Sequence, residues 1–165
     1  MAGLPSSIRA MAQRTPVEDV MLAVLREKLP DIGINTLISK SQTLPFVLVR
    51  RGNILGDDTG DPRFIDRASV IVECFCVDPN GDDDASILSE AVRVALIEAG
   101  RERKVYAGLG HIVAVTMTSS PRRAPDWATS TGPVQYADLP TGFWRYETQY
   151  TVAVRKPSTN PYPTP

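Results

Sequence analysis

The sequence predicts one α+β domain in which a mostly antiparallel β-sheet carries two helices on one face. Segments with helical and with alternating periodicity follow each other in the order helix, strand, strand, strand, helix, strand, strand. The 165 residues, 42% of them hydrophobic, fit a single domain with its own core and exclude a globally disordered chain. A long hairpin and a long loop are expected to project from this body.

Composition along the chain divides it into three parts. Residues 1–14 show little pattern and are expected to form a flexible N-terminal segment. Residues 15–156 contain all the periodic segments and are expected to form the domain. Residues 157–165 contain four prolines and are expected to form an extended C-terminal tail.

Two segments are expected to form helices. The first covers residues 15–29, because Thr15 and Pro16 suit a helix start and Pro30 disfavours helix at the residue before it. The second begins at Asp82, Asp83 and Asp84, which can cap it and complement its dipole, and is expected to stop at Gly100. Its apolar stripe consists of Ala85, Leu88, Ala91, Val92, Ala95, Leu96 and Ala99.

The first three strands are expected at residues 32–39, 46–51 and 65–77. The later half of 65–77 is apolar on both faces, which is typical of a strand in the centre of a sheet. Residues 52–64 contain three glycines and three aspartates, so they are expected to form a projecting hairpin tip between two strands.

The last two strands are expected at residues 110–119 and 143–156, separated by a loop over 120–140. In the fourth strand, Val113, Val115 and Met117 are expected on one face. In the fifth, a buried set alternates with a wet set. The buried set is Trp144, Tyr146, Tyr150, Val152 and Val154, and the wet set is Arg145, Glu147, Gln149, Thr151 and Arg155.

Charge and hydropathy exclude several classes of protein. The net charge of −1 argues against a basic surface made for duplex DNA. No apolar run approaches the length of a membrane span, and the first residues lack the hydrophobic core of a secretion signal. Cys74 and Cys76 fall on one face of the third strand and are expected to be reduced packing residues, as in a cytosolic protein.

Few residues suggest catalysis. His111 is the single histidine and starts a strand, where a surface or sheet-edge role fits it. Asp57, Asp58 and Asp61 lie in the glycine-rich loop without the spacing of a calcium-binding hand. No glycine-rich phosphate motif is present. We therefore expect no catalytic residue, cofactor or metal; a small metal-assisted enzyme using His111 and these aspartates remains an alternative.

Basic residues suggest contacts with partners. Arg122 and Arg123, with Trp127 nearby, favour a protein interface, since arginine and tryptophan are frequent at binding hot spots. Stacking on single-stranded nucleic acid is the alternative. Further interface candidates are Arg50 and Arg51 beside the hairpin, and Arg145, Glu147 and Arg155 on the last strand, whose other interpretation is an ordinary solvated face.

The order of elements resembles the tail terminator proteins of long-tailed bacteriophages, also called minor tail or tail-completion proteins. The likeness spans about residues 16–156. It consists of the helix opening at Pro16-Val17-Glu18-Asp19, the strand 44–52 with its aspartate and glycine loop, the strand 65–78 running into the alanine-rich helix 85–99, and the last strand 143–155. The Pro-rich tail lies outside the pattern, and no short diagnostic motif is involved.

The resemblance implies a structural protein of the virion without catalytic residues or cofactors. Proteins of this family form a hexameric ring that caps the head-proximal end of the tail tube, ends its growth and docks onto the head–tail connector, and DNA passes through the lumen. The expected partners are therefore copies of the chain itself, the tail tube protein and the connector, in the host cytoplasm during assembly. A neighbouring neck subunit is an alternative of the same class. The loop carrying Asp57, Asp58, Asp61 and Arg63 is the candidate contact with the lumen or tube.

Overall fold

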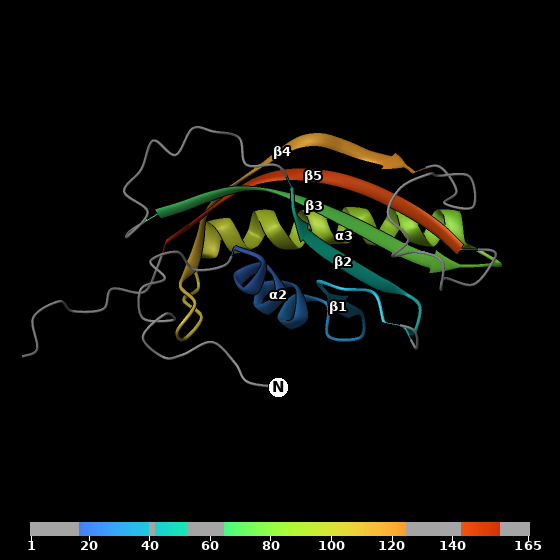
Figure 1. Cartoon of the computed structure of the whole chain (residues 1–165), viewed down its shortest axis with the longest axis horizontal. Helices are drawn as coiled ribbons and strands as arrows, with labels where there is room; N and C mark the ends of the chain where they lie inside the picture. Colours follow the sequence, from blue (N-terminus) through green and yellow to red (C-terminus); the bar gives the residue numbers. More distant parts are fainter. Residues whose placement is uncertain (1–16, 40–41, 53–64, 125–142, 156–165) are drawn as a thin grey trace, which may run out of the picture.

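The computed structural model describes residues 17–39, 42–52, 65–124 and 143–155. They form a five-stranded sheet with strand order β1-β2-β3-β5-β4 and two helices packed against it (Figure 1). Neighbouring strands are antiparallel except β1 and β2, which run parallel. The predicted α+β class is confirmed, and β3 lies in the centre of the sheet. The elements are α2 (Val17–Lys28), β1 (Gly33–Asn35), β2 (Phe46–Arg51), β3 (Ile65–Val77), α3 (Gly81–Glu102), β4 (His111–Arg123) and β5 (Phe143–Arg155).

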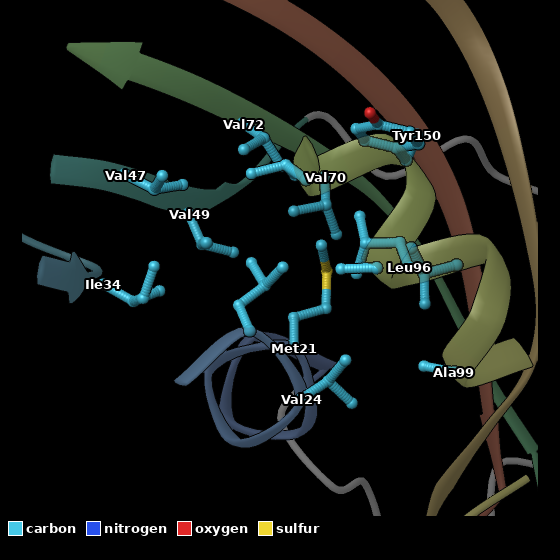
Figure 2. Packing of buried hydrophobic residues seen from close by; sticks show 14 of the residues in the cluster. Met21, Val24, Ile34, Val47, Val49, Val70, Val72, Leu96, Ala99 and Tyr150 are labelled. Atoms are coloured by element: carbon cyan, nitrogen blue, oxygen red, sulfur yellow. The ribbon is translucent and has the colours of Figure 1, made fainter. Parts of the chain in front are cut away.

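The main core lies between one face of the sheet and the two helices (Figure 2). Alternating side chains of β2 and β3, such as Val47, Val49, Val70 and Val72, point into it because successive residues of a strand face opposite sides. The helices contribute their apolar stripes, Val17, Val20, Met21, Val24 and Leu25 from α2 and Ala85, Leu88, Val92, Ala95, Leu96 and Ala99 from α3. Both helices therefore share one core and one face of the sheet, as predicted.

The helix α3 ends two residues later than predicted. Gly100 continues the helix, and the backbone turns at Arg103, which adopts a left-handed conformation with φ of 51°. Its N–H donates to the carbonyl oxygen of Ala99 at 3.0 Å, which satisfies one of the last carbonyls of the helix. At the other end Asp82, Asp83 and Asp84 lie within the first turn, where their charge complements the dipole. They do not occupy the N-cap position, which belongs to Asn80.

The two edge strands also differ from the prediction. β1 covers only three residues of the expected run 32–39. β4 continues to Arg123, so the loop expected from residue 120 starts later, because Arg122 and Arg123 still pair with Glu147 and Tyr146 of β5. Three register shifts interrupt this pairing. The first, at Val113, removes that residue from the face of Val115 and places Ile112 in the core instead.

The start of β5 is held against the first turn of α3 by Trp144. Its indole Nε1–H donates to Asp78 Oδ1 at 2.7 Å, and the guanidinium of Arg123 lies 3.9 Å from the ring centroid. The ring packs so closely on α3 that a Cβ added to Gly81 would stand 2.2 Å from its Cδ1 atom. Glycine at position 81 is therefore a packing requirement.

The substitution Gly81→Ala is expected to destabilise the fold by about 1–3 kcal/mol, the usual cost of overpacking, because Trp144 is fixed by its hydrogen bond and stacking partner. Gly100→Ala in the same helix is the matched control. Its Cβ would meet only Ile112 and Val115 at 3.9 Å, so the gain in helix propensity should stabilise the fold by about 0.5–1 kcal/mol. Urea unfolding of both variants measures this difference, and equal effects would contradict the packing argument.

Candidate functional site

We call the face of the sheet opposite the helices the open face. It carries the side chains of the strands that alternate with those in the main core. At one end it holds a small buried cluster of Phe46, Leu48 and Phe75, against which Ile38, Leu44 and Phe143 pack. The rings of Phe46 and Phe75 are stacked with centroids 4.5 Å apart. β3 is therefore buried on both faces over this stretch, as its continuous apolar run predicted.

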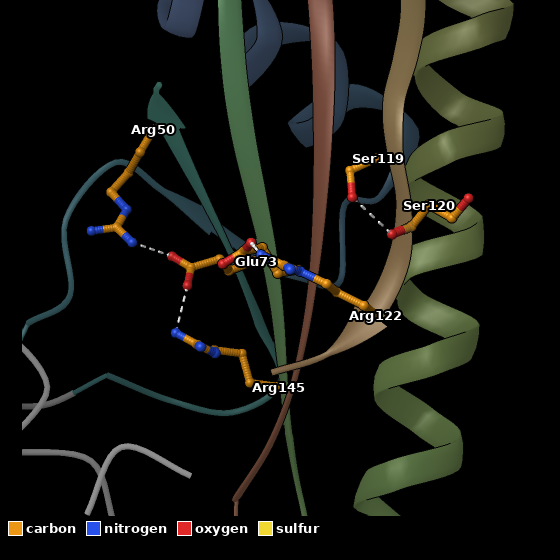
Figure 3. Close-up of polar contacts among 7 residues, drawn as sticks. Arg50, Glu73, Ser119, Ser120, Arg122 and Arg145 are labelled. Atoms are coloured by element: carbon orange, nitrogen blue, oxygen red, sulfur yellow. Dashed lines mark hydrogen bonds and ion pairs between the residues drawn. The ribbon is translucent and has the colours of Figure 1, made fainter. Parts of the chain in front are cut away.

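Glu73 is the charged residue within this apolar run and projects onto the open face. Arg50 Nη2 donates to its Oε2 at 2.5 Å, and Arg145 Nη1 donates to its Oε1 at 2.7 Å (Figure 3). The Glu73 residue is 1% exposed and Arg145 is 6% exposed. The carboxylate thus joins β2 and β5 across β3, on the side of the sheet away from α3 (Figure 3).

Arg145 therefore corrects the prediction of a wet face on β5. Its position opposite Phe75 in the β3–β5 register places it beside the apolar cluster, where an arginine needs a carboxylate. Glu73 supplies it, and the two charges are buried together. The same alternation correctly predicted Tyr150, Val152 and Val154 in the core.

A second, more exposed ion pair lies on the open face, between β4 and β5. Arg122 of β4 donates to Glu147 Oε1 at 2.6 Å, with 65% of its side chain exposed. Arg123, the next residue of β4, faces the opposite side of the sheet because successive strand residues alternate, and there it stacks on Trp144. Its Nε also lies 3.9 Å from Asp82 Oδ1. The two adjacent arginines thus contact β5 on opposite faces of the sheet, Arg122 through Glu147 and Arg123 through Trp144.

The structure brings together four of the predicted interface residues, Arg50, Arg122, Arg145 and Glu147, on the open face. It places the remaining described ones elsewhere. Arg51 approaches the buried Asp66 at 3.6 Å, and Arg155 pairs in register with His111 at the far end of the sheet. Asp57, Asp58, Asp61, Arg63 and Trp127, together with residues 1–14 and 157–165, lie outside the described residues.

Sequence reasoning missed Glu73 and Asp66, the two most buried carboxylates of the described chain, each 1% exposed. A signal for Glu73 was present, since a lone acid in an apolar strand requires a cation. Its partners Arg50 and Arg145 lie 23 and 72 residues away in sequence, so sequence spacing could not predict the pairing.

His111 lies in a cationic setting. Partial burial, followed by the charges of Arg155 and Arg103, lowers the pKa of its imidazole from the ordinary value. Among residues 17–39, 42–52, 65–124 and 143–155, no three histidine, cysteine, aspartate or glutamate side chains are grouped to hold a metal ion. The aspartates of the enzyme alternative lie outside these ranges.

Both cysteines are free and buried, as predicted. Burial raises the pKa of the Cys76 thiol to about 11, and burial raises that of Cys74 further. Both therefore remain neutral thiols at physiological pH and act as small apolar side chains.

Comparisons with protein families and with curated proteins found no match. Of the two helices in the described part of the chain, neither has an apolar stretch that would span a lipid bilayer.

Replacing Glu73 by a neutral residue tests the role of its buried ion pairs with Arg50 and Arg145. Glu73→Gln should destabilise the fold by about 3–5 kcal/mol, because it removes the charge of one partner from a buried ion pair, in which Glu73 accepts from Arg145 at 2.7 Å. The matched control is Glu147→Gln on the same face, whose partner Arg122 is largely exposed, so the loss should be much smaller. The measurement is the free energy of unfolding of both variants in urea, and losses of similar size would refute the buried role of Glu73.

Proposed function

We propose that the chain is a structural assembly protein of a long-tailed bacteriophage that forms a ring at the head-proximal end of the tail. The ring caps the tail tube, ends its polymerisation and joins the tail to the head connector. The support is the order of elements from α2 to β5, which resembles the tail terminator pattern described for the sequence. The proposed place of action is the virion, after assembly in the host cytoplasm.

The sheet has a feature that suits ring formation. Its two edges are unlike, since β1 has three residues and β4 has thirteen. A cyclic ring uses a head-to-tail contact between two different patches of each subunit, and a plate with two unlike edges offers such patches on opposite sides. This observation carries the proposal of a cyclic assembly, for which six copies is the expected number from the family resemblance.

The charges of the open face support the same class of function. Arg50, Arg122, Arg145 and Glu147 are engaged within the chain, where their ion pairs link neighbouring strands. A rigid plate is what a stable ring around a tube needs. The same engagement weighs against single-stranded nucleic acid as the partner of Arg122 and Arg123, since one is ion-paired and the other is stacked on Trp144.

The mass of the purified chain tests ring formation. Light scattering should give a multiple of the 18.0 kDa monomer, and electron microscopy should show ring-shaped particles. In phage lacking the chain, tails should grow beyond their normal length. Normal tail length without the chain would contradict the terminator role, and a virion map with the chain elsewhere in the neck would favour the neighbouring subunit.

The loop 52–64 is proposed to face the lumen or the tube. Aspartates there would repel the phosphates of passing DNA and keep it from binding. Replacing Asp57, Asp58 and Asp61 together by lysine should slow DNA ejection, more strongly at low salt than at high salt. The control replaces Asp83 and Asp84 on α3 by lysine and should leave ejection unchanged, and thermal unfolding checks that the chain stays folded without these charges at the helix start. Unchanged ejection in the loop variant would exclude the lumen assignment.

A further inference from the structure

We propose that one end of the sheet binds the phosphate backbone of duplex nucleic acid without reading its sequence. The site consists of basic side chains from the starts of β3 and β4, the end of β5 and the end of α3. We call it the basic corner, and it contains Arg67, Arg101, Arg103, His111 and Arg155. A single copy of the chain carries the whole basic corner, so the inference does not depend on the proposed ring.

The basic corner collects the basic side chains that the fold leaves without an acidic partner. Most other basic side chains of the described chain pair with a carboxylate, namely Lys28, Arg50, Arg51, Arg93, Lys104, Arg122, Arg123 and Arg145. Arg26 donates instead to the carbonyl oxygen of Ile34 at 2.8 Å. Within residues 17–39, 42–52, 65–124 and 143–155, no hydrogen bond or ion pair engages a side chain of the basic corner. Its positive charge therefore remains available to a ligand.

Strand pairing brings three of these residues together on the open face. Val154 belongs to the main core, so the next residue, Arg155, projects to the open face. Arg155 pairs in register with His111 on one side and with Ile65 on the other, and residues paired in this way project to the same face. Arg67 lies two residues beyond Ile65 and is a diagonal neighbour of Arg155, at a usual separation of about 7–8 Å.

The end of α3 brings the other two arginines to the same end of the sheet. A Cβ added to Gly100 would lie 3.9 Å from side-chain atoms of Ile112 and of Val115, so the last turn of α3 packs on the start of β4 (Figure 1). Arg101 and Arg103 follow directly and are both exposed.

Electrostatics supports this grouping. Partial burial, followed by the charges of Arg155 and Arg103, lowers the pKa of the His111 imidazole, so both guanidinium groups act on it. Glu102 lies between the two arginines of α3 in sequence, but it accepts from Lys28 at 2.6 Å. The nearest carboxylate in sequence is thus already bound to another cation.

These residues fit a phosphate backbone better than other ligands. Arginine matches phosphate oxygens with parallel N–H donors, and a cluster of cations attracts the regularly spaced charges of nucleic acid. The basic corner contains no aromatic side chain on which an unpaired base could stack, which favours a duplex over a single strand. Contacts with phosphates carry no sequence information. Because the chain has a net charge of −1, we expect weak binding that depends strongly on salt.

Fluorescence anisotropy of a labelled DNA duplex tests the site. Arg67→Gln and Arg155→Gln each remove one exposed cation of the basic corner. Each should weaken duplex binding by about tenfold in about 50 mM NaCl and lower the slope of log affinity against log salt by about one. The double variant should lose both contacts. Circular dichroism and thermal unfolding check that all variants are folded.

Arg122→Gln is the matched control. It removes the same charge from the other end of the open face, where Arg122 pairs with Glu147. This variant should bind the duplex nearly as tightly as the wild type. A loss as large as that of Arg155→Gln would show that net charge determines binding, whatever the position of the residue, and would overturn the inference.

His111 gives the site a pH dependence that the arginines cannot give. Partial burial and the charges of Arg155 and Arg103 lower its pKa, so most of the imidazole is uncharged at neutral pH. A bound phosphate favours the protonated form, so duplex affinity should rise as the pH falls from about 7.5 to about 5.5. His111 is the single histidine of the chain, and His111→Gln should abolish this rise. An equal rise in His111→Gln would overturn its assignment to the basic corner.

The outcomes separate this inference from the proposed function. If the wild type does not bind the duplex in low salt, or if Arg67→Gln and Arg155→Gln bind it as tightly as the wild type, the basic corner is overturned and the ring proposal stands. Polyglutamate that displaces the duplex as effectively as unlabelled DNA would assign the basic corner to an acidic protein segment and also overturn the inference. Duplex binding through the basic corner together with normal tail length in phage lacking the chain would support the inference and contradict the terminator role.

Discussion

The carboxylate of Glu73 binds one arginine from each neighbouring strand and so links the three central strands of the sheet. β3 is buried on both of its faces around Glu73, and a charge in such a stretch is tolerated only when partners reach it. Arg50 and Arg145 do so in one alignment of β2, β3 and β5. A slip of one residue would turn Glu73 toward the helices and Cys74 toward the arginines, so the ion pairs fix the register.

Much of the fold could be predicted from the sequence because its periodicities are local. The bounds of β3 and the stripe of α3 follow from alternation and helical spacing. The departures have non-local causes. β4 continues past Ser120 because Glu147 and Tyr146 of another strand pair with it, and α3 passes Gly100 because the backbone can turn at Arg103.

The candidate surfaces were predictable in part for the same reason. Arginine and glutamate on the last strands indicated polar contacts, but spacing could not show that Arg145 would be buried against Glu73, 72 residues away. The stack of Arg123 on Trp144 depends on the continuation of β4 past Ser120, which its pairing with β5 decides. The sequence pattern thus predicted which residue types make polar contacts, and the pairing of the strands determines which residues they contact.

The engagement of the open-face charges bears on where a subunit contact would form. An arginine already bound to a buried carboxylate gains little from a second partner, since much of its electrostatic interaction is already made. The open face would therefore contribute stiffness, and association would draw on apolar and aromatic groups that the fold leaves uncovered. Leu37 and Met117, which are 72% and 40% exposed, are groups of this kind in the described part of the chain.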